Sequence, residues 1–405
     1  MHLSMITRHF SLLLLLGSLL PAQEQVRAVV PAHAPSSNRF LSPGVDAGDY
    51  LYISGQGPHR ADGTVPSAPD AQFRQALDNV KTIVESAGLT LENVVYVQVY
   101  LTDISSYSQM NRVFGEYFPK TPPARAVLGV YALPDPPVEI NAVAVRNFEG
   151  RRVIHPPNFS TAESASPGIL THDRLFISSM AGVDPATGKV PDDPAAQVDL
   201  ALDRMQSVVR AAGLGMSHVV FVNPYLTSEI PMRVMNERYA RRFEFGNTPG
   251  RATIQVSSLP GGAHIEYTGV AVRDLQQRKA VRPKNMLPSP TASPCVFAGD
   301  TLYCSAKSGF IPGPHGGVYA TLPNINFGRL CAISSITSKK RGWTLVKWWQ
   351  QTCIWTTWPM RQHLTKFMVN ISDQSCRRVP PFNRLLPQNV RRIRMTSIPI
   401  SSKFH

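Results

Sequence analysis

The sequence predicts an α+β fold that occurs as tandem copies of one domain. Corresponding residues of two copies, such as Gly88 and Gly213 or Tyr100 and Tyr225, lie 125 residues apart. Motifs recur as well, since YLYISGQ is echoed by RLFISSM, and MNRVFGEYF by MNERYARRF. A repeat of this length with only small insertions indicates a duplicated domain. In each copy short β segments accompany two helical segments, which predicts helices packed on one face of a sheet.

The elements of the first copy follow in order along the chain. Two short β segments come first, the second of them YLYISGQ. A long helix is expected after SAPDAQ, because apolar residues recur there at spacings of three and four: Phe73, Leu77, Val80 and Val84. The pair Ala87-Gly88 ends this helix. The alternating, β-branched stretch VVYVQVYL, residues 94–101, predicts a strand, and a shorter helix and two more strands complete the copy.

Pro-rich segments and the repeat set the predicted domain boundaries. LYCS from Leu302 stands where LYIS from Leu51 stands in the first copy, so a third copy begins after the second. The predicted units are a first domain at 39–148, a second at 166–275, a linker at 276–293 and the start of a third domain at 294–320.

The last part of the chain, residues 321–405, differs in composition from all that precedes it. It carries 14 Lys/Arg against one acid, whereas residues 1–320 carry 27 basic and 26 acidic residues, so the basic excess lies in the tail. The possible codons in the neighbouring frame permit glycine, tyrosine and arginine at intervals of 12 and 25 residues, the intervals that separate Gly88, Tyr100 and Arg125. We therefore interpret 321–405 as an out-of-frame tail and not as a native domain.

The alternative for the tail is a genuine basic domain whose tryptophans and arginines bind nucleic acid. The stretches IWTTW and VKWWQ show no sustained helix or strand period, which counts against a folded domain. The sequence therefore predicts no nucleic-acid partner.

The N-terminus, residues 1–22, is typical of a secretory signal peptide. Arg8 precedes an apolar run from Phe10 to Leu20, and Ala22 is a small residue at which cleavage could occur. The run is too short to span a bilayer. We expect a secreted or periplasmic protein with no membrane contact after signal removal, or a cytoplasmic one if the signal does not function.

Together, the motifs YISGQ, VVYVQVYLTD, MNRVFGEYF, PPAR and VEINAVAV resemble those of the Rid (YjgF/YER057c/UK114) family. The resemblance covers about residues 40–147 and 168–274. It implies tandem chorismate-mutase-like (YjgF-type) domains, each a mixed sheet with two helices packed on one face. Members are typically homotrimers with a ligand site in each cleft between subunits, so three copies in one chain imply a pseudo-trimer within the chain, or else an oligomer of chains. Active members hydrolyse 2-imino and enamino acids to 2-keto acids and ammonia without a metal or cofactor.

The resemblance also assigns site residues. Arg125 matches the family's PAR arginine, and Arg251 is its counterpart; a guanidinium fork can hold a carboxylate by two parallel hydrogen bonds. Glu139 and Glu266 match the family's acidic position and could orient the attacking water. Other matches to pocket positions are Ser54, Gly55, Asn111, Ser178 and Asn236.

Each assignment has a structural alternative. Arg125 could form a surface ion pair, and Glu139 could be the solvent-facing member of an alternating strand. Asn111 could lie on a polar helix face, and Ser54-Gly55 could form a turn.

The second copy departs from the family pattern in two places. SSM replaces SGQ at residues 178–180, and Pro224 is expected to interrupt a strand, which puts the catalytic competence of this copy in question.

The predicted function is an enamine/imine deaminase acting on a small imino or enamino acid. The alternatives are a non-enzymatic ligand-binding or interaction module of the same fold, or the inactive product of a frameshifted gene.

Overall fold

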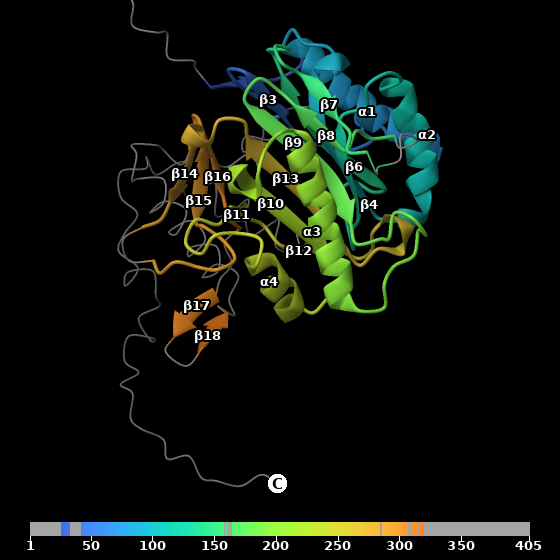
Figure 1. Cartoon of the computed structure of the whole chain (residues 1–405). Helices are drawn as coiled ribbons and strands as arrows, with labels where there is room; N and C mark the ends of the chain where they lie inside the picture. Colours follow the sequence, from blue (N-terminus) through green and yellow to red (C-terminus); the bar gives the residue numbers. More distant parts are fainter. Residues whose placement is uncertain are drawn as a thin grey trace, which may run out of the picture.

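A computed structural model describes residues 26–32, 42–157, 159, 164–283, 286–306, 310–313 and 316–319. The predicted signal peptide and the predicted out-of-frame tail lie outside these residues. Within them the chain forms two complete copies of one domain and the first strands of a third (Figure 1).

Copy 1 is a six-stranded sheet with two helices on one face. Strands pair in the order β1-β2-β3-β6-β4-β5, and because β4 and β5 run parallel while the other neighbours are antiparallel, the sheet is mixed. Its elements are β1 Arg27–Val29, β2 Gly44–Ala47, β3 Tyr50–Gln56, α1 Pro69–Ser86, β4 Val94–Leu101, α2 Tyr107–Tyr117, β5 Ala124–Gly129 and β6 Val138–Val145.

Copy 2 repeats this arrangement with the strand order β7-β8-β9-β13-β10-β11, and β12 also pairs with β10. Its elements are β7 Arg152–Ile154, β8 Gly168–Leu170, β9 Arg174–Ala181, α3 Pro194–Ala211, β10 Val219–Leu226, α4 Met232–Ala240, β11 Gly250–Arg251, β12 Ile254–Gln255 and β13 Ile265–Val272.

Copy 3 is described only at its start. A three-stranded sheet in the order β14-β15-β16 matches the first three strands of the other copies, and a β17–β18 hairpin follows. These strands are β14 Arg278–Val281, β15 Cys295–Ala298, β16 Thr301–Cys304, β17 Phe310–Gly313 and β18 Gly316–Tyr319.

The predicted elements are confirmed, and the prediction missed one short strand per copy. β1 and β7 lie outside the predicted domains 39–148 and 166–275, and β14 lies within the predicted linker 276–293. Each consists of three or four residues, too few to show an alternating pattern, and each is held by antiparallel pairing with the first strand of the hairpin that follows.

The prediction that Pro224 interrupts its strand is wrong. β10 runs through Pro224 and pairs continuously with β13 from Phe221 to Leu226. The parallel neighbour on its other side is split instead, because β11 and β12 pair with β10 separately, whereas β5 of copy 1 is continuous. A proline has no N–H to donate, so we assign the missing ladder bond to this split side.

The long helices pack closely on their sheets because glycine occupies the contact points. A Cβ on Gly44 would lie 2.7 Å from Ile83 Cγ2, and one on Gly168 would lie 2.8 Å from Val208 Cγ1. The helix α1 ends as predicted, since Ala87 is its C-cap and Gly88 adopts a φ of +72°. The apolar face of each long helix thus forms the core of its own copy with one sheet face.

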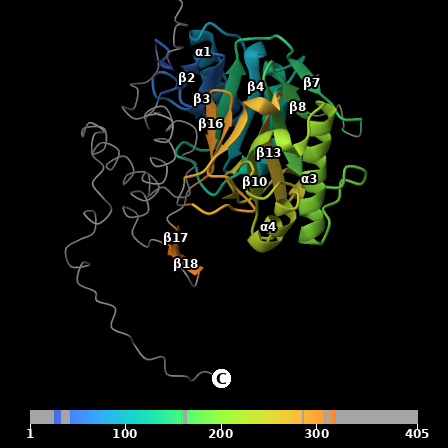
Figure 2. The same cartoon turned by 60° about the vertical axis from the view of Figure 1, so that its left-hand side comes forward.

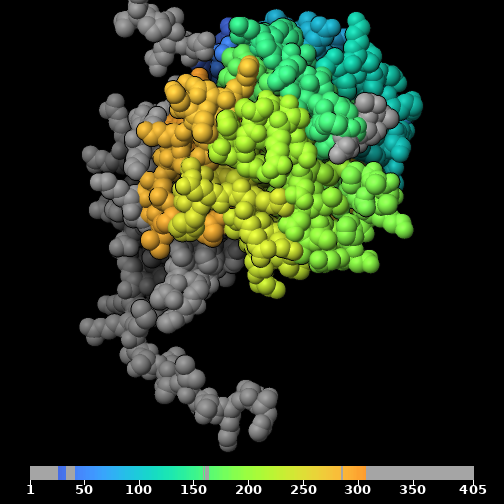
Figure 3. Space-filling model, viewed as in Figure 1, coloured from blue at the N-terminus to red at the C-terminus, as the bar shows by residue number. Residues whose placement is uncertain are grey.

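The opposite faces of the sheets bring the copies together. An apolar cluster joins copies 1 and 2 through Tyr50, Val95, Ala124, Val145, Ile169 and Phe176. The corresponding cluster joins copy 2 to copy 3 through Val220, Val272, Val296, Ala298 and Tyr303. The strands of copy 3 therefore lie against copy 2 (Figures 2 and 3).

Arg174 on β9 contacts all three copies. Its Nη1 donates to the hydroxyl of Tyr303 at 3.1 Å and to that of Tyr52 at 3.5 Å. The guanidinium lies 4.3 Å from the ring centre of Tyr50 and is also paired with Asp173. Copies 1, 2 and 3 therefore meet around one buried cation.

Candidate functional site between the copies

Arg125 is buried at the start of β5, with its side chain against helix α2. Its Nη2 donates to Asn111 Oδ1 at 2.6 Å and to Ser164 Oγ at 2.8 Å. The guanidinium also lies 3.9 Å from the sulfur of Met110 and 4.4 Å from the ring centre of Phe114. An arginine that is only 4% exposed does not form a surface ion pair, so this alternative is wrong. The structure thus brings together the predicted site residues Arg125 and Asn111.

Copy 2 provides the opposite side of this site. The hydroxyl of Ser178 on β9 accepts the backbone N–H of Arg125 at 2.7 Å and donates to the carbonyl of Ser166 at 2.6 Å. Strands β5 and β9 pack side by side. Ser178 therefore hydrogen-bonds the arginine of copy 1, whereas the arginine of its own copy bonds Ser305 of copy 3.

Glu266 on β13 lies on the copy 2 side of the same interface. Its carboxylate accepts a hydrogen bond from Ser179, the residue after Ser178. Burial raises the pKa of Glu266 to about 7, although the Ser179 hydrogen bond and the charge of Arg204 both act to lower it. Burial also raises the pKa of Tyr96 on β4 of copy 1, and the Glu266 charge adds to this rise. Glu266 therefore acts electrostatically on the strand that pairs with the Arg125 strand.

The interface between copies 1 and 2 carries a cationic group from copy 1 and an acidic group from copy 2. Because the family resemblance implies a ligand cleft at such an interface, it is hereafter called the first cleft. Copy 1 provides Arg125 and Asn111, and copy 2 provides Ser178, Ser179 and Glu266. Sequence reasoning did not select Ser179, although the change from SGQ to SSM marked its position.

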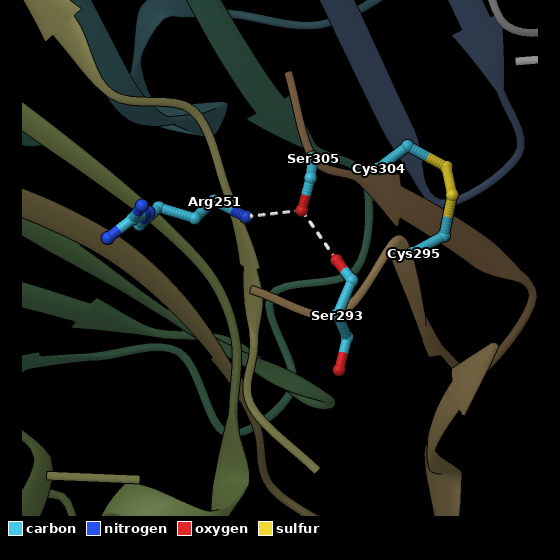
Figure 4. The surroundings of a disulfide bond; sticks show 5 residues. All are labelled: Arg251, Ser293, Cys295, Cys304 and Ser305. Carbon is cyan, nitrogen blue, oxygen red and sulfur yellow. Dashed lines mark hydrogen bonds between the residues drawn. A yellow bond between two sulfur atoms is a disulfide. The ribbon is translucent and has the colours of Figure 1, made fainter. Parts of the chain in front are cut away.

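Arg251 has an equivalent environment between copies 2 and 3. Its Nη1 donates to Asn236 Oδ1 at 2.7 Å, and the guanidinium lies 5.1 Å from the ring centre of Tyr239. Its backbone N–H donates to the hydroxyl of Ser305 at 2.9 Å, and this hydroxyl donates to the carbonyl of Ser293 (Figure 4). Burial lowers the pKa of Arg251 from its ordinary value. Ser305 is thus the copy 3 counterpart of Ser178.

A disulfide joins the two strands of copy 3 that Ser293 and Ser305 flank (Figure 4). Cys295 on β15 and Cys304 on β16 are direct cross-strand partners and are bonded to each other. The corresponding partners are Gly44 and Ile53 in copy 1 and Gly168 and Ile177 in copy 2. The disulfide was not predicted, although the alignment of LYCS with LYIS placed Cys304 in the second strand of a hairpin.

The remaining predicted residues, Ser54, Gly55 and Glu139, lie together in copy 1, on β3 and β6. Ser54 donates to the carbonyl of Ser42 at 2.7 Å, as Ser178 and Ser305 do to their own preceding segments. The Glu139 carboxyl occupies the space next to Gly55, where a Cβ would overlap it. By the pattern of the other two interfaces, an arginine of a complete copy 3 would face this group. The chain positions that would provide it fall in 321–405, the predicted out-of-frame tail, which lies outside the described structure.

No cluster of three or more His, Cys, Asp or Glu side chains suited to a metal ion occurs in the part of the chain that the structure describes. Within the same residues, no helix is both long and apolar enough to cross a membrane.

Comparison with known proteins identifies the domain. The family model described as Endoribonuclease L-PSP matches residues 31–146 and 158–273. A RutC family protein of Pyrococcus horikoshii is 38% identical over 117 residues, which are 28% of this chain and 93% of that protein. A 2-iminobutanoate/2-iminopropanoate deaminase of Escherichia coli is 38% identical over 125 residues, 30% of this chain and 98% of the relative. The crystal structure of the E. coli YjgF gene product is 37% identical, covers 30% of this chain and 99% of its own, and has a TM-score of 0.29.

The two family matches coincide with the two complete copies seen in the structure. Both copies have the predicted α+β architecture, a mixed sheet with two helices on one face. The chain therefore belongs to the Rid (YjgF) family and carries two tandem domains of its chorismate-mutase-like fold.

Proposed function

We propose that the protein is an enamine/imine deaminase that hydrolyses small 2-imino acids to 2-keto acids and ammonia in the first cleft. The observation that carries this proposal is the buried guanidinium of Arg125 on one side of the interface, with the buried carboxyl of Glu266 on the other. The name of the E. coli relative supports the reaction class.

The site suits a substrate with a carboxylate next to a C=N bond. The guanidinium of Arg125 is oriented by Asn111 and can bind the carboxylate through two parallel charge-assisted hydrogen bonds. The hydroxyl of Ser164 accepts from the same nitrogen, so the substrate would take its place. Binding in this way fixes the imine carbon relative to the walls of the cleft.

Glu266 provides the acid–base function in this proposal. Its carboxylate accepts a proton from a water molecule as the water oxygen bonds to the imine carbon, and the proton passes to the nitrogen. The hydroxyl proton of the resulting carbinolamine then passes to the same nitrogen through the Glu266 carboxylate, the C–N bond breaks and the C=O bond forms. This step releases ammonia and leaves the 2-keto acid. A pKa of about 7 suits a group that both accepts and returns a proton near neutral pH.

The other two clefts are less complete among the described residues. Arg251 has its serine from copy 3, but the described part of copy 3 ends before the strand that would carry an acid matching Glu266. Glu139 in turn lies next to Gly55 of its own copy, whereas the serine that contacts Arg125 comes from copy 2. We therefore assign turnover to the first cleft.

The second candidate is a ligand-binding module of the same fold without turnover. The contact of Ser164 with Arg125 favours this candidate, because the connecting segment already fills one hydrogen-bonding position of the clamp. The family model's description as an endoribonuclease suggests RNA as a ligand, but residues 1–320 carry nearly balanced charge, in contrast to the basic surface that phosphate backbones require.

We further propose that the protein acts outside the cytoplasm, because residues 1–22 have the pattern of a secretory signal peptide.

Hydrolysis of 2-iminopropanoate tests the proposal. The imine is generated in the assay by oxidation of alanine, and its loss is followed by trapping with semicarbazide. Arg125→Ala is expected to abolish the acceleration, whereas Arg112→Ala, which removes an exposed arginine of α2 paired with Asp70, is the matched control and retains it. Unchanged turnover in Arg125→Ala would contradict the role of Arg125 in binding the substrate carboxylate. Binding of a 2-keto acid without any turnover by the wild type would favour the ligand-binding module.

A further inference from the structure

Copies 1 and 2 differ at one position beside their acidic residue. Gly55 on β3 and Ser179 on β9 occupy the same place in the repeat, one residue after the serines at positions 54 and 178. In copy 1 the Glu139 carboxyl fills the space beside the glycine. In copy 2 the serine hydroxyl is present and donates to the Glu266 carboxylate.

Ser179 is well placed to fix the Glu266 side chain. Glu266 is only 4% exposed, and within the described part of the chain Ser179 is the side chain that hydrogen-bonds its carboxylate. A glutamate has three side-chain torsions, so one directed hydrogen bond restricts where its free oxygen can point. A glycine at the same position, as in copy 1, cannot provide this bond.

The charged and titratable groups that face Glu266 come from three further elements. Arg204 on α3 attracts the carboxylate, and Tyr96 on β4 of copy 1 is affected by its charge. Tyr225 is its direct partner on β10. The two tyrosines remain neutral at physiological pH because burial raises the pKa of each phenol. Ser179 and Arg204 are therefore the groups that favour the ionised form of Glu266.

We propose that Ser179 is a positioning residue for Glu266 in the first cleft, where its hydroxyl orients the carboxylate and favours the ionised, proton-accepting form. The proposal rests on the proposed deaminase function and assigns to copy 2 a feature that the SGQ sequence of copy 1 lacks. The SSM sequence then adapts copy 2 to its place opposite Arg125, and it is not a loss of function.

Replacement of Ser179 by Ala and by Thr tests this role. Loss of the hydrogen bond in Ser179→Ala removes a group that lowers the pKa of Glu266, so the carboxyl should ionise at higher pH. The acidic limb of the kcat/KM profile for 2-iminopropanoate is expected to move up by about one pH unit. Ser179→Thr keeps the hydroxyl and should retain the wild-type limb. Ser207→Ala, which removes an exposed hydroxyl bonded to the α3 backbone, is the control.

A second measurement separates this proposal from the proposed function. The pKa of the Glu266 carboxyl is read by 13C NMR of side-chain carboxyls in the full chain, with the signal assigned by its loss in Glu266→Gln. An upward shift of the Glu266 pKa in Ser179→Ala supports the positioning role even if the wild type shows no turnover. Absence of turnover would overturn only the proposed deaminase function. A lower rate in Ser179→Ala with an unmoved limb and an unmoved carboxyl pKa would overturn the role of Ser179.

Discussion

At the scale of single residues, the most unusual group in the first cleft is the buried carboxyl of Glu266. Its pKa is raised from 4.5 to about 7 because burial disfavours the charge. The native protein therefore holds a proton at this site that the unfolded chain releases above about pH 4.5. The stability contributed by this group is present at low pH and is lost as the pH rises through 7.

This shift leads to a prediction about stability. Between pH 5 and pH 8 the wild type should lose about 2 kcal/mol more unfolding free energy than Glu266→Gln, because the glutamine does not ionise. Urea unfolding of both proteins at the two pH values measures the difference. Equal losses would show that Glu266 ionises at an ordinary pH despite its burial.

The sequence allowed prediction of the chemical groups of the site but not of their pairing. Arg125 and Asn111 could be recognised because each lies in a motif of its own copy. Their partner Ser178 lies on another copy, and only the packing of β5 beside β9 determines that contact. Ser179 stood out as a departure from the repeat, and its bond to Glu266 required the sheet register.

At the scale of elements, glycine determines how closely each long helix approaches its sheet. A Cβ added to Gly168 on β8 would lie 2.8 Å from Val208 Cγ1 and 3.2 Å from Leu175 Cδ1. Gly115, by contrast, lies within α2 and has nothing within 4 Å of such a Cβ. The two glycines therefore differ in whether a methyl group can be accommodated.

Alanine substitutions at these two positions should have opposite effects. Gly168→Ala should destabilise the protein by about 1 to 3 kcal/mol, because α3 must move from the sheet. Gly115→Ala should stabilise it by up to about 1 kcal/mol, because alanine favours the helix. Chemical denaturation of both variants measures the changes. Stabilisation by Gly168→Ala would show that α3 does not pack on β8 as described.

The long elements were predictable because they carry many periodic residues, as the match of strand 94–101 shows. The short strands β1, β7 and β14 were not, because their pairing with the following hairpin holds them in place and their own pattern is too short. The strand through Pro224 was misjudged for a related reason. A proline removes the ladder bond on one side only, and the sequence does not reveal which side is needed.

At the scale of the whole molecule, the described contacts repeat from one pair of copies to the next. Ser178 contacts the Arg125 strand as Ser305 contacts the Arg251 strand. Arg174 of copy 2 hydrogen-bonds Tyr52 of copy 1 and Tyr303 of copy 3. We propose that the two complete copies and the start of the third occupy pseudo-threefold positions within one chain, which linkers favour by keeping the copies at high effective concentration.

Arg174 is expected to hold copy 3 against the other two. Arg174→Ala leaves the hydroxyls of buried Tyr303 and half-buried Tyr52 without this donor and removes packing, so it should destabilise the protein by about 3 kcal/mol or more. Amide hydrogen exchange across residues 295–304 should become faster in this variant. Arg233→Ala removes an exposed arginine paired with Glu237 and is the control. Unchanged exchange in Arg174→Ala would show that copy 3 is held independently of this cation.

The proposed site is shared by copies 1 and 2, and a comparison of their two acidic residues shows which of them acts with Arg125. The measurement is kcat/KM for 2-iminopropanoate in Glu266→Gln and Glu139→Gln. We predict a loss of about 100-fold or more in Glu266→Gln and a loss of less than about threefold in Glu139→Gln. A large loss in Glu139→Gln with near-normal activity in Glu266→Gln would contradict the assignment of Arg125 and Glu266 to one cleft.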